Sequence, residues 1–96
     1  QGSVMNSLHR IAGGGAEAME FTVGPGTRHL GVPLKDLKLR PGVLLAVIVR
    51  GNDIIIPQGS SSLQEGDRVI IIARGGGVPD LNDIYGAEPN LGGAGA

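Results

Sequence analysis

The chain has 96 residues, which suits one domain and is too short for two. Its net charge is −1, with eight basic and nine acidic residues, and Phe21 and Tyr85 are its only Phe, Tyr or Trp residues. Nucleic acid is therefore not expected as a partner, because its binding relies on basic surfaces and stacking aromatic rings. The absence of cysteine excludes disulfides, thiolate chemistry and zinc–cysteine sites.

The first sixteen residues are predicted to precede the main domain. Gln1-Gly2-Ser3 resembles a tag remnant. In residues 4–11, Val4, Met5, Leu8 and Ile11 recur at helical spacing, which predicts one short amphipathic helix. The glycines at 13–15 then form a linker.

The next segments predict a strand followed by a short helix. Residues 17–23 alternate apolar and polar side chains, the pattern of a half-buried strand. Gly24-Pro25-Gly26 ends this strand. Pro33 then stands at the first position of a short helix, where its missing N–H costs nothing, and Pro41-Gly42 ends that helix.

The second half of the chain is predicted to be mainly strands. Strands over 43–50 and 53–56 flank Gly51-Asn52, which has the composition of a two-residue hairpin turn. The remaining segments are expected to be a loop with Leu63 pointing inward, a strand over 67–74, a short helix over 78–85 and a disordered tail over 86–96.

This order predicts a small α+β domain, with a mostly antiparallel β-sheet and short helices on one face. The expected boundaries are 1–16 for the tag remnant, helix and linker, 17–85 for the domain and 86–96 for the tail. Residues 43–49 and 69–73 are apolar at successive positions, so both faces of the sheet are expected to be apolar. Large exposed apolar patches are rare on monomers, and a second copy would cover the other face in a homodimer. The alternative is that the N-terminal helix folds back over it.

Motifs of catalysis and metal binding are not recognised. The glycine-rich stretches at 13–15, 24–26 and 75–77 match neither a P-loop nor a dinucleotide fingerprint, so they are interpreted as turns. His9 and His29 lack the spacing of metal ligands. We therefore expect no catalytic or metal-binding residues and no enzymatic activity.

Arg50 is the candidate binding residue, because it ends an apolar strand beside the hairpin tip. Its planar donors suit a phosphate or carboxylate. Pro57 is expected across the hairpin, where isoleucine and proline would form an apolar floor for a nucleobase. The alternative is a surface arginine that reaches water.

Three stretches resemble one known family: "AEAMEFTV", "LGVPLKDLKL" and "VLLAVIVRGNDIIIPQGSSSLQEGDRVIIIA". Together they are similar to the TrkA-C domain, also called the RCK C-terminal domain (regulator of conductance of potassium), from about Glu17 to Tyr85. The resemblance implies a cytoplasmic regulatory domain that dimerises and gates a membrane potassium transporter. The domain would lie at the inner membrane through that transporter partner, without inserting itself. Nucleotide cofactors of the family belong to a preceding domain, so none is expected here.

The resemblance also implies a candidate ligand. Some members bind cyclic di-AMP between two such domains, and the matching positions here are Leu44, Val49, Arg50, Ile56 and Pro57. Asp53 adds a negative charge nearby, which disfavours a phosphate. Two alternatives stay open: a purely structural dimerisation module, and the same domain attached to a cation/proton antiporter or an anion permease.

Overall fold

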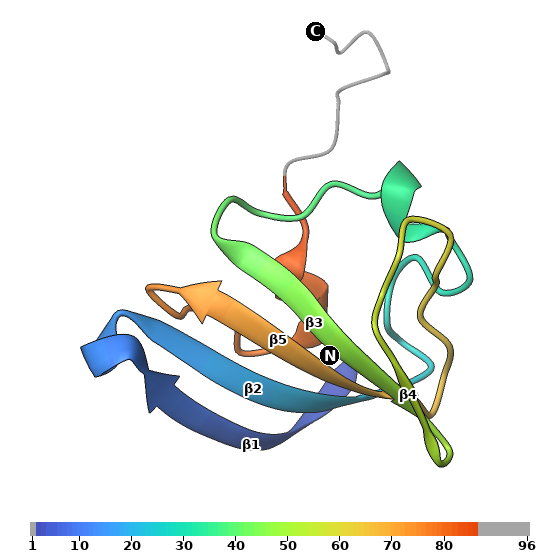
Figure 1. Cartoon of the computed structure of the whole chain (residues 1–96). Coiled ribbons are helices and arrows are strands. Elements are labelled where there is room, and N and C mark those ends of the chain that lie inside the picture. The colour runs from blue at the N-terminus through green and yellow to red at the C-terminus, as the bar shows by residue number, and fades with distance from the viewer. Residues whose placement is uncertain (1, 87–96) are drawn as a thin grey trace, which may run out of the picture.

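The computed structural model describes residues 2–86, which form a five-stranded antiparallel sheet in the order β1-β2-β5-β3-β4 (Figure 1). Helical segments in this part of the chain are short 3₁₀ turns, and none is long and apolar enough to cross a membrane. The antiparallel sheet confirms that part of the predicted fold class, whereas two of the three predicted helices are single 3₁₀ turns. The elements are β1 (Ser3–Ile11), η1 (Ala12–Gly14), β2 (Ala16–Val23), η2 (Leu34–Asp36), β3 (Val43–Arg50), β4 (Asp53–Ile55), β5 (Arg68–Arg74) and η3 (Leu81–Ile84).

The helix predicted over residues 4–11 is wrong, because this segment is the edge strand β1, paired antiparallel with β2. A β-bulge between Met5 and Ser7 explains the misleading spacing. The extra residue, Asn6, shifts the alternation, so that Met5 and Leu8, three apart, oppose the core residues Phe21 and Met19. A bulged strand can therefore imitate a helical repeat.

The other predicted strands are confirmed, and their observed ends differ from the predicted ends by at most one residue. The hairpin turn at Gly51-Asn52 is confirmed as well, since Arg50 and Asp53 are paired across it. Gly51 has a positive φ of 61°, a conformation that favours glycine. The strand expected to reach Ile56 ends at Ile55, before Pro57, which cannot donate to a ladder.

One face of the sheet carries the core, and the loops and η3 cover it (Figure 1). Phe21, Ile48 and Val69 are completely buried at its centre. Leu63 is also buried, as predicted, and it closes the side near the hairpin. Burying a side chain of this size stabilises the fold by about 1.5–3 kcal/mol. The core comprises Met19, Phe21, Val23, Leu45, Ile48, Leu63, Val69, Ile71, Ala73, Val78, Leu81, Ile84 and Tyr85.

The start of β1 is fastened to the start of η3. The Asp80 carboxylate accepts bonds from the backbone N–H of Gly2 and Ser3 at 3.1–3.2 Å and from Ser3 Oγ at 2.8 Å. It also accepts from the N–H of Asn82, which makes it the N-cap of η3. Gly2 and Ser3, interpreted from the sequence as a tag remnant, are therefore buried parts of the fold. The tail predicted over 86–96 lies outside the described residues except for Gly86.

Candidate functional site

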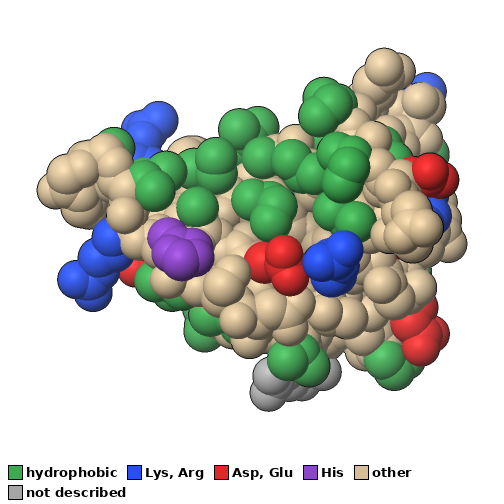
Figure 2. All heavy atoms as spheres, turned by 60° about the horizontal axis from the view of Figure 1, so that its bottom comes forward, with side chains coloured by type: hydrophobic (Ala, Val, Ile, Leu, Met, Phe, Trp, Pro, Cys, Tyr) green, Lys and Arg blue, Asp and Glu red, His purple; other side chains and the backbone are tan. Residues whose placement is uncertain are grey.

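The uncovered face of the sheet is the first candidate surface, and we call it the outer face. Strand pairing places Leu44 opposite Ile72, Val47 opposite Ile70 and Val49 opposite Ile54 on this side. Leu44, Ile54 and Ile56 expose 57%, 66% and 69% of their surface. Figure 2 shows a continuous patch of hydrophobic side chains, bordered by a histidine, an acidic and a basic side chain. Its apolar members are Ala18, Leu44, Val47, Val49, Ile54, Ile56, Ile70 and Ile72.

The N-terminal segment does not cover this face. Because residues 3–11 extend the sheet at its edge, the alternative in which an N-terminal helix folds back over the sheet is wrong. β1 instead widens the face, with Val4 and Ile11 exposed on it. The apolar character of both faces, predicted from the runs in β3 and β5, is thus confirmed.

The five predicted binding residues are divided between two sides of the sheet. Leu44, Val49 and Ile56 belong to the outer face, and Pro57 is half-buried beside it. Arg50 follows Val49 in the strand and points to the opposite side. Its Nε and Nη2 donate to Oδ1 and Oδ2 of Asp67 at 2.9 and 2.8 Å.

The Arg50–Asp67 ion pair lies near the hairpin. The Asp67 side chain is 1% exposed and also accepts from the Gln64 N–H at 2.9 Å. Arg50 Nη2 donates a further bond to the Ser62 carbonyl at 2.9 Å. The hydrogen bond to Asp67 raises the pKa of the Arg50 guanidinium above its usual value. Arg50 therefore anchors the turn that leads into β5, which the sequence interpretation did not foresee.

Sequence reasoning missed Asp67 and Asp80 as organising residues. One signal was available for Asp67: Arg50 and Asp67 stand at the ends of two apolar runs that pair in the sheet. Burial alone would raise the pKa of Asp80, but its bonds from Asn82, Gly2 and Ser3 outweigh burial and lower that pKa. For Asp80 the signal was its place near the start of the last predicted helix, where aspartate commonly caps the first turn; its bonds to Gly2 and Ser3 had no such signal.

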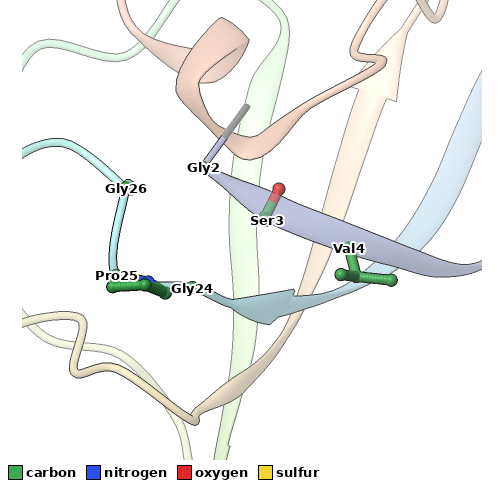
Figure 3. Close-up of a pocket in the computed structure, with 6 residues that line it drawn as sticks. All are labelled: Gly2, Ser3, Val4, Gly24, Pro25 and Gly26. Atoms are coloured by element: carbon green, nitrogen blue, oxygen red, sulfur yellow. The ribbon is translucent and has the colours of Figure 1, made fainter.

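The hollow beside this junction offers little chemistry. It is lined by Gly2, Ser3, Val4, Gly24, Pro25 and Gly26, and Figure 3 shows Ser3 pointing from it toward η3. Thr27 Oγ1 donates to the Gly2 carbonyl across the same junction. Among residues 2–86, every buried side-chain nitrogen or oxygen has a hydrogen-bond partner. In the same residues, no group of three His, Asp or Glu side chains is placed to hold a metal ion.

The fold and its surface define a small antiparallel β-domain with an exposed apolar sheet face. The model of the TrkA-C domain matches residues 18–86. The chain belongs to the TrkA-C domain family.

Curated relatives carry the same domain in longer proteins. Trk system potassium uptake protein TrkA homolog 2 of Methanosarcina mazei is 32% identical over 81% of this chain and 17% of its own length. TrkA homolog 1 of the same organism is 33% identical over 88% of this chain and 19% of its own length. The Trk system potassium uptake protein TrkA homolog of Archaeoglobus fulgidus is 37% identical over 79% of this chain and 17% of its own length. This chain thus spans less than a fifth of these relatives.

Proposed function

We propose that this domain is a regulatory module of a potassium uptake system and acts as a homodimer joined through the outer face. The family and the names of the relatives support the potassium system. The observation that carries the homodimer is the exposure of Leu44, Ile54 and Ile56 on one continuous apolar face. A two-fold dimer buries the same patch on both copies and removes it from water.

The dimer test uses Leu44→Asp, because Leu44 is exposed in the single chain and its replacement leaves the core untouched. In the dimer the new carboxylate would be buried without a partner, which is costly. Sedimentation equilibrium at micromolar concentration should give a dimer for the wild type and a folded monomer for Leu44→Asp. Leu8→Asp is the matched control, since Leu8 is 43% exposed but lies on the other side of β1. A wild-type monomer, or a Leu44→Asp dimer of unchanged affinity, would refute this interface.

The proposed regulation is a change in the geometry of the dimer, passed to a membrane transporter at the cytoplasmic side of the membrane. A signal can shift such a geometry only through different affinities for two arrangements. The test is potassium-limited growth of a deletion strain that carries the full-length protein. Leu44→Asp should impair growth at low potassium and Leu8→Asp should not. Normal growth of both would leave the uptake role without support.

We further propose cyclic di-AMP as the regulatory ligand, bound between the two copies with its bases against Val49, Ile56 and Pro57. Because Arg50 points away from the outer face, each phosphate would reach an Arg50 side chain around the end of the hairpin. Within residues 2–86, Arg50 Nη1 makes no hydrogen bond to another residue, so it is the nitrogen available to a phosphate while Nε and Nη2 stay on Asp67. Charge-assisted arginine–phosphate bonds are short and strong.

Titration calorimetry with cyclic di-AMP tests the ligand. Ile56→Ala removes part of the apolar floor and should weaken binding about tenfold, whereas Val4→Ala, at another exposed apolar position on β1, should not. No heat with the wild type would leave the purely structural dimerisation module as the function. Arg50→Ala is unsuitable here, because it also strips Asp67 of its partner. The other alternative, attachment to an antiporter or permease, is tested by identifying the full-length protein that contains the domain.

A further inference from the structure

A row of three ionisable side chains crosses the margin of the outer face. Glu20 lies on β2 opposite Ile70, and Arg68 lies one same-face position further along β5, opposite Thr22. His9 stands at the mirrored diagonal position on β1, opposite Ala18. Figure 2 shows a histidine, an acidic and a basic side chain side by side along one border of the hydrophobic patch.

Glu20 and Arg68 are diagonal neighbours that do not pair within the chain. Diagonal residues on one sheet face lie about 7–8 Å apart. No ion pair or hydrogen bond joins these two side chains among residues 2–86. Instead, Glu20 Oε2 accepts from Asn6 Nδ2 at 3.0 Å, which holds the carboxylate in place. Arg68 is exposed.

Covering the outer face changes the environment of both charges. A charge taken out of water needs a partner, and an unpaired one is costly. One acid and one base lie apart from each other on the same patch, so a second copy of the patch can complement both. In a two-fold interface, if the acid of one copy contacts the base of the other, the reverse contact forms as well. This charge complementarity favours a second copy of the chain over an unrelated partner.

We propose that the two copies dock with Glu20 of each opposite Arg68 of the other, which fixes one register for the dimer. This inference rests on the dimer proposed above and goes beyond it by naming the contacts that select its geometry. A two-fold axis in the interface must then cross the line from Glu20 to Arg68 at its midpoint and at right angles. An axis along that line would instead set Glu20 against Glu20 and Arg68 against Arg68.

The sheet lattice allows this docking to be followed further. Neighbouring strands lie about 4.8 Å apart, and same-face residues repeat about every 6.7 Å along a strand. On this lattice the axis passes over Ile70 and Val47, so these apolar side chains meet their own copies at the centre. The same rotation lays Leu44 of one copy over Ile56 of the other, so this register describes the dimer without the cyclic dinucleotide proposed above.

The resulting interface is consistent with known sheet packing. Strands of the two copies cross at about 70° on this lattice, near the orthogonal class of sheet packing. The apolar side chains occupy the centre and the charge pairs lie toward the rim, the usual distribution in protein interfaces. The register thus satisfies the apolar face and both charges at once.

A charge-swap experiment on the whole chain tests the register. Glu20→Lys alone sets lysine against Arg68 twice, and Arg68→Glu alone sets glutamate against Glu20 twice. In sedimentation equilibrium, the dimer dissociation constant of each variant should be at least about tenfold higher than that of the wild type, since like charges in an interface are strongly repulsive. Glu65→Lys and Lys35→Glu make the same charge changes at exposed positions away from the outer face and should leave the affinity unchanged.

Mixing the two variants provides the decisive result. A heterodimer of Glu20→Lys with Arg68→Glu restores two opposite-charge contacts, so the mixture should dimerise with about wild-type affinity. The double variant in one chain should also recover, and circular dichroism confirms that each variant is folded. Recovery of the double variant without recovery of the mixture would mean that the charges act within a chain, and would overturn the proposal.

The remaining outcomes separate this inference from the dimer itself. A wild-type dimer with both single variants at unchanged affinity overturns the register and leaves the dimer standing. A wild-type monomer overturns both.

Discussion

Arg50→Ala should destabilise the domain, because it leaves the Asp67 carboxylate buried without its partner. Asp67 is 1% exposed, and two of the bonds that it accepts come from the Arg50 guanidinium. Removing one member of a buried ion pair costs about 3–5 kcal/mol. Arg50 itself is 42% exposed, and solvent screening reduces the value of such a contact. We therefore expect a loss of about 2–3 kcal/mol in the free energy of unfolding.

The assay is urea denaturation at one fixed protein concentration, because association shifts apparent stability. A loss of this size should also lower the melting temperature by about 10–20 °C in a domain of this length. Arg10→Ala is the matched control, since Arg10 is an exposed arginine on β1, and it should change stability by less than about 0.5 kcal/mol.

A double-mutant cycle isolates the contact. Asp67→Asn removes the charge but retains an oxygen that can accept from the Gln64 N–H. In this background Arg50→Ala should cost about 1 kcal/mol or less, because no uncompensated carboxylate remains. Equal costs of Arg50→Ala in both backgrounds, or a cost below about 0.5 kcal/mol in the wild type, would refute the anchoring role.

Three further predictions concern the core and the junction between β1 and η3. Phe21→Ala should cost about 3–5 kcal/mol in urea denaturation, because Phe21 is fully buried; a loss below about 1 kcal/mol contradicts this. Gly2→Ala should lower the melting temperature, because its Cβ would stand 2.8 Å from Thr27 Cα and 2.9 Å from the Gly26 carbonyl oxygen, whereas Gly86→Ala, whose Cβ would have no neighbour nearer than 3.5 Å, should cost less. The lowered pKa of Asp80 contributes stability above the ordinary aspartate pKa of about 3.9 that is lost as pH falls through the folded-state pKa. Asp80→Asn should therefore flatten the acid side of the stability–pH curve, and an unchanged curve would contradict that role.

The strands of the core could be predicted from the sequence because their patterns are local. Residues 17–23 alternate cleanly, and Gly51-Asn52 supplies a hairpin turn between two apolar runs. The edge strand β1 could not be predicted in this way, because the bulge at Asn6 converts a two-residue period into the spacing of a helix. A periodicity argument has no means of detecting one extra residue whose partner strand is unknown.

The binding residues show the same limit at longer range. Arg50 was interpreted as a binding residue because it ends an apolar strand beside the hairpin tip and its planar donors suit a phosphate. Its actual partner, Asp67, is brought beside it only by the pairing of β3 with β5. The apolar outer face, by contrast, follows from the composition of those two strands alone. The composition of the strands thus indicated the apolar outer face. The partner of Arg50 could be found only from the register in which the strands pair.

The junction of Gly2 and Ser3 with Asp80 has a consequence for how the chain folds. These contacts join residues separated by 77 and 78 positions, and β2 pairs with the central strand β5, which begins only at Arg68. Topologies dominated by such distant pairings fold slowly, since loop closure precedes most of the gain in contacts. During synthesis the hairpin of β1 and β2 cannot form its remaining contacts until nearly the whole domain has left the ribosome. Its strands stay exposed to incorrect pairing until β5 pairs with β2 and η3 binds the start of β1.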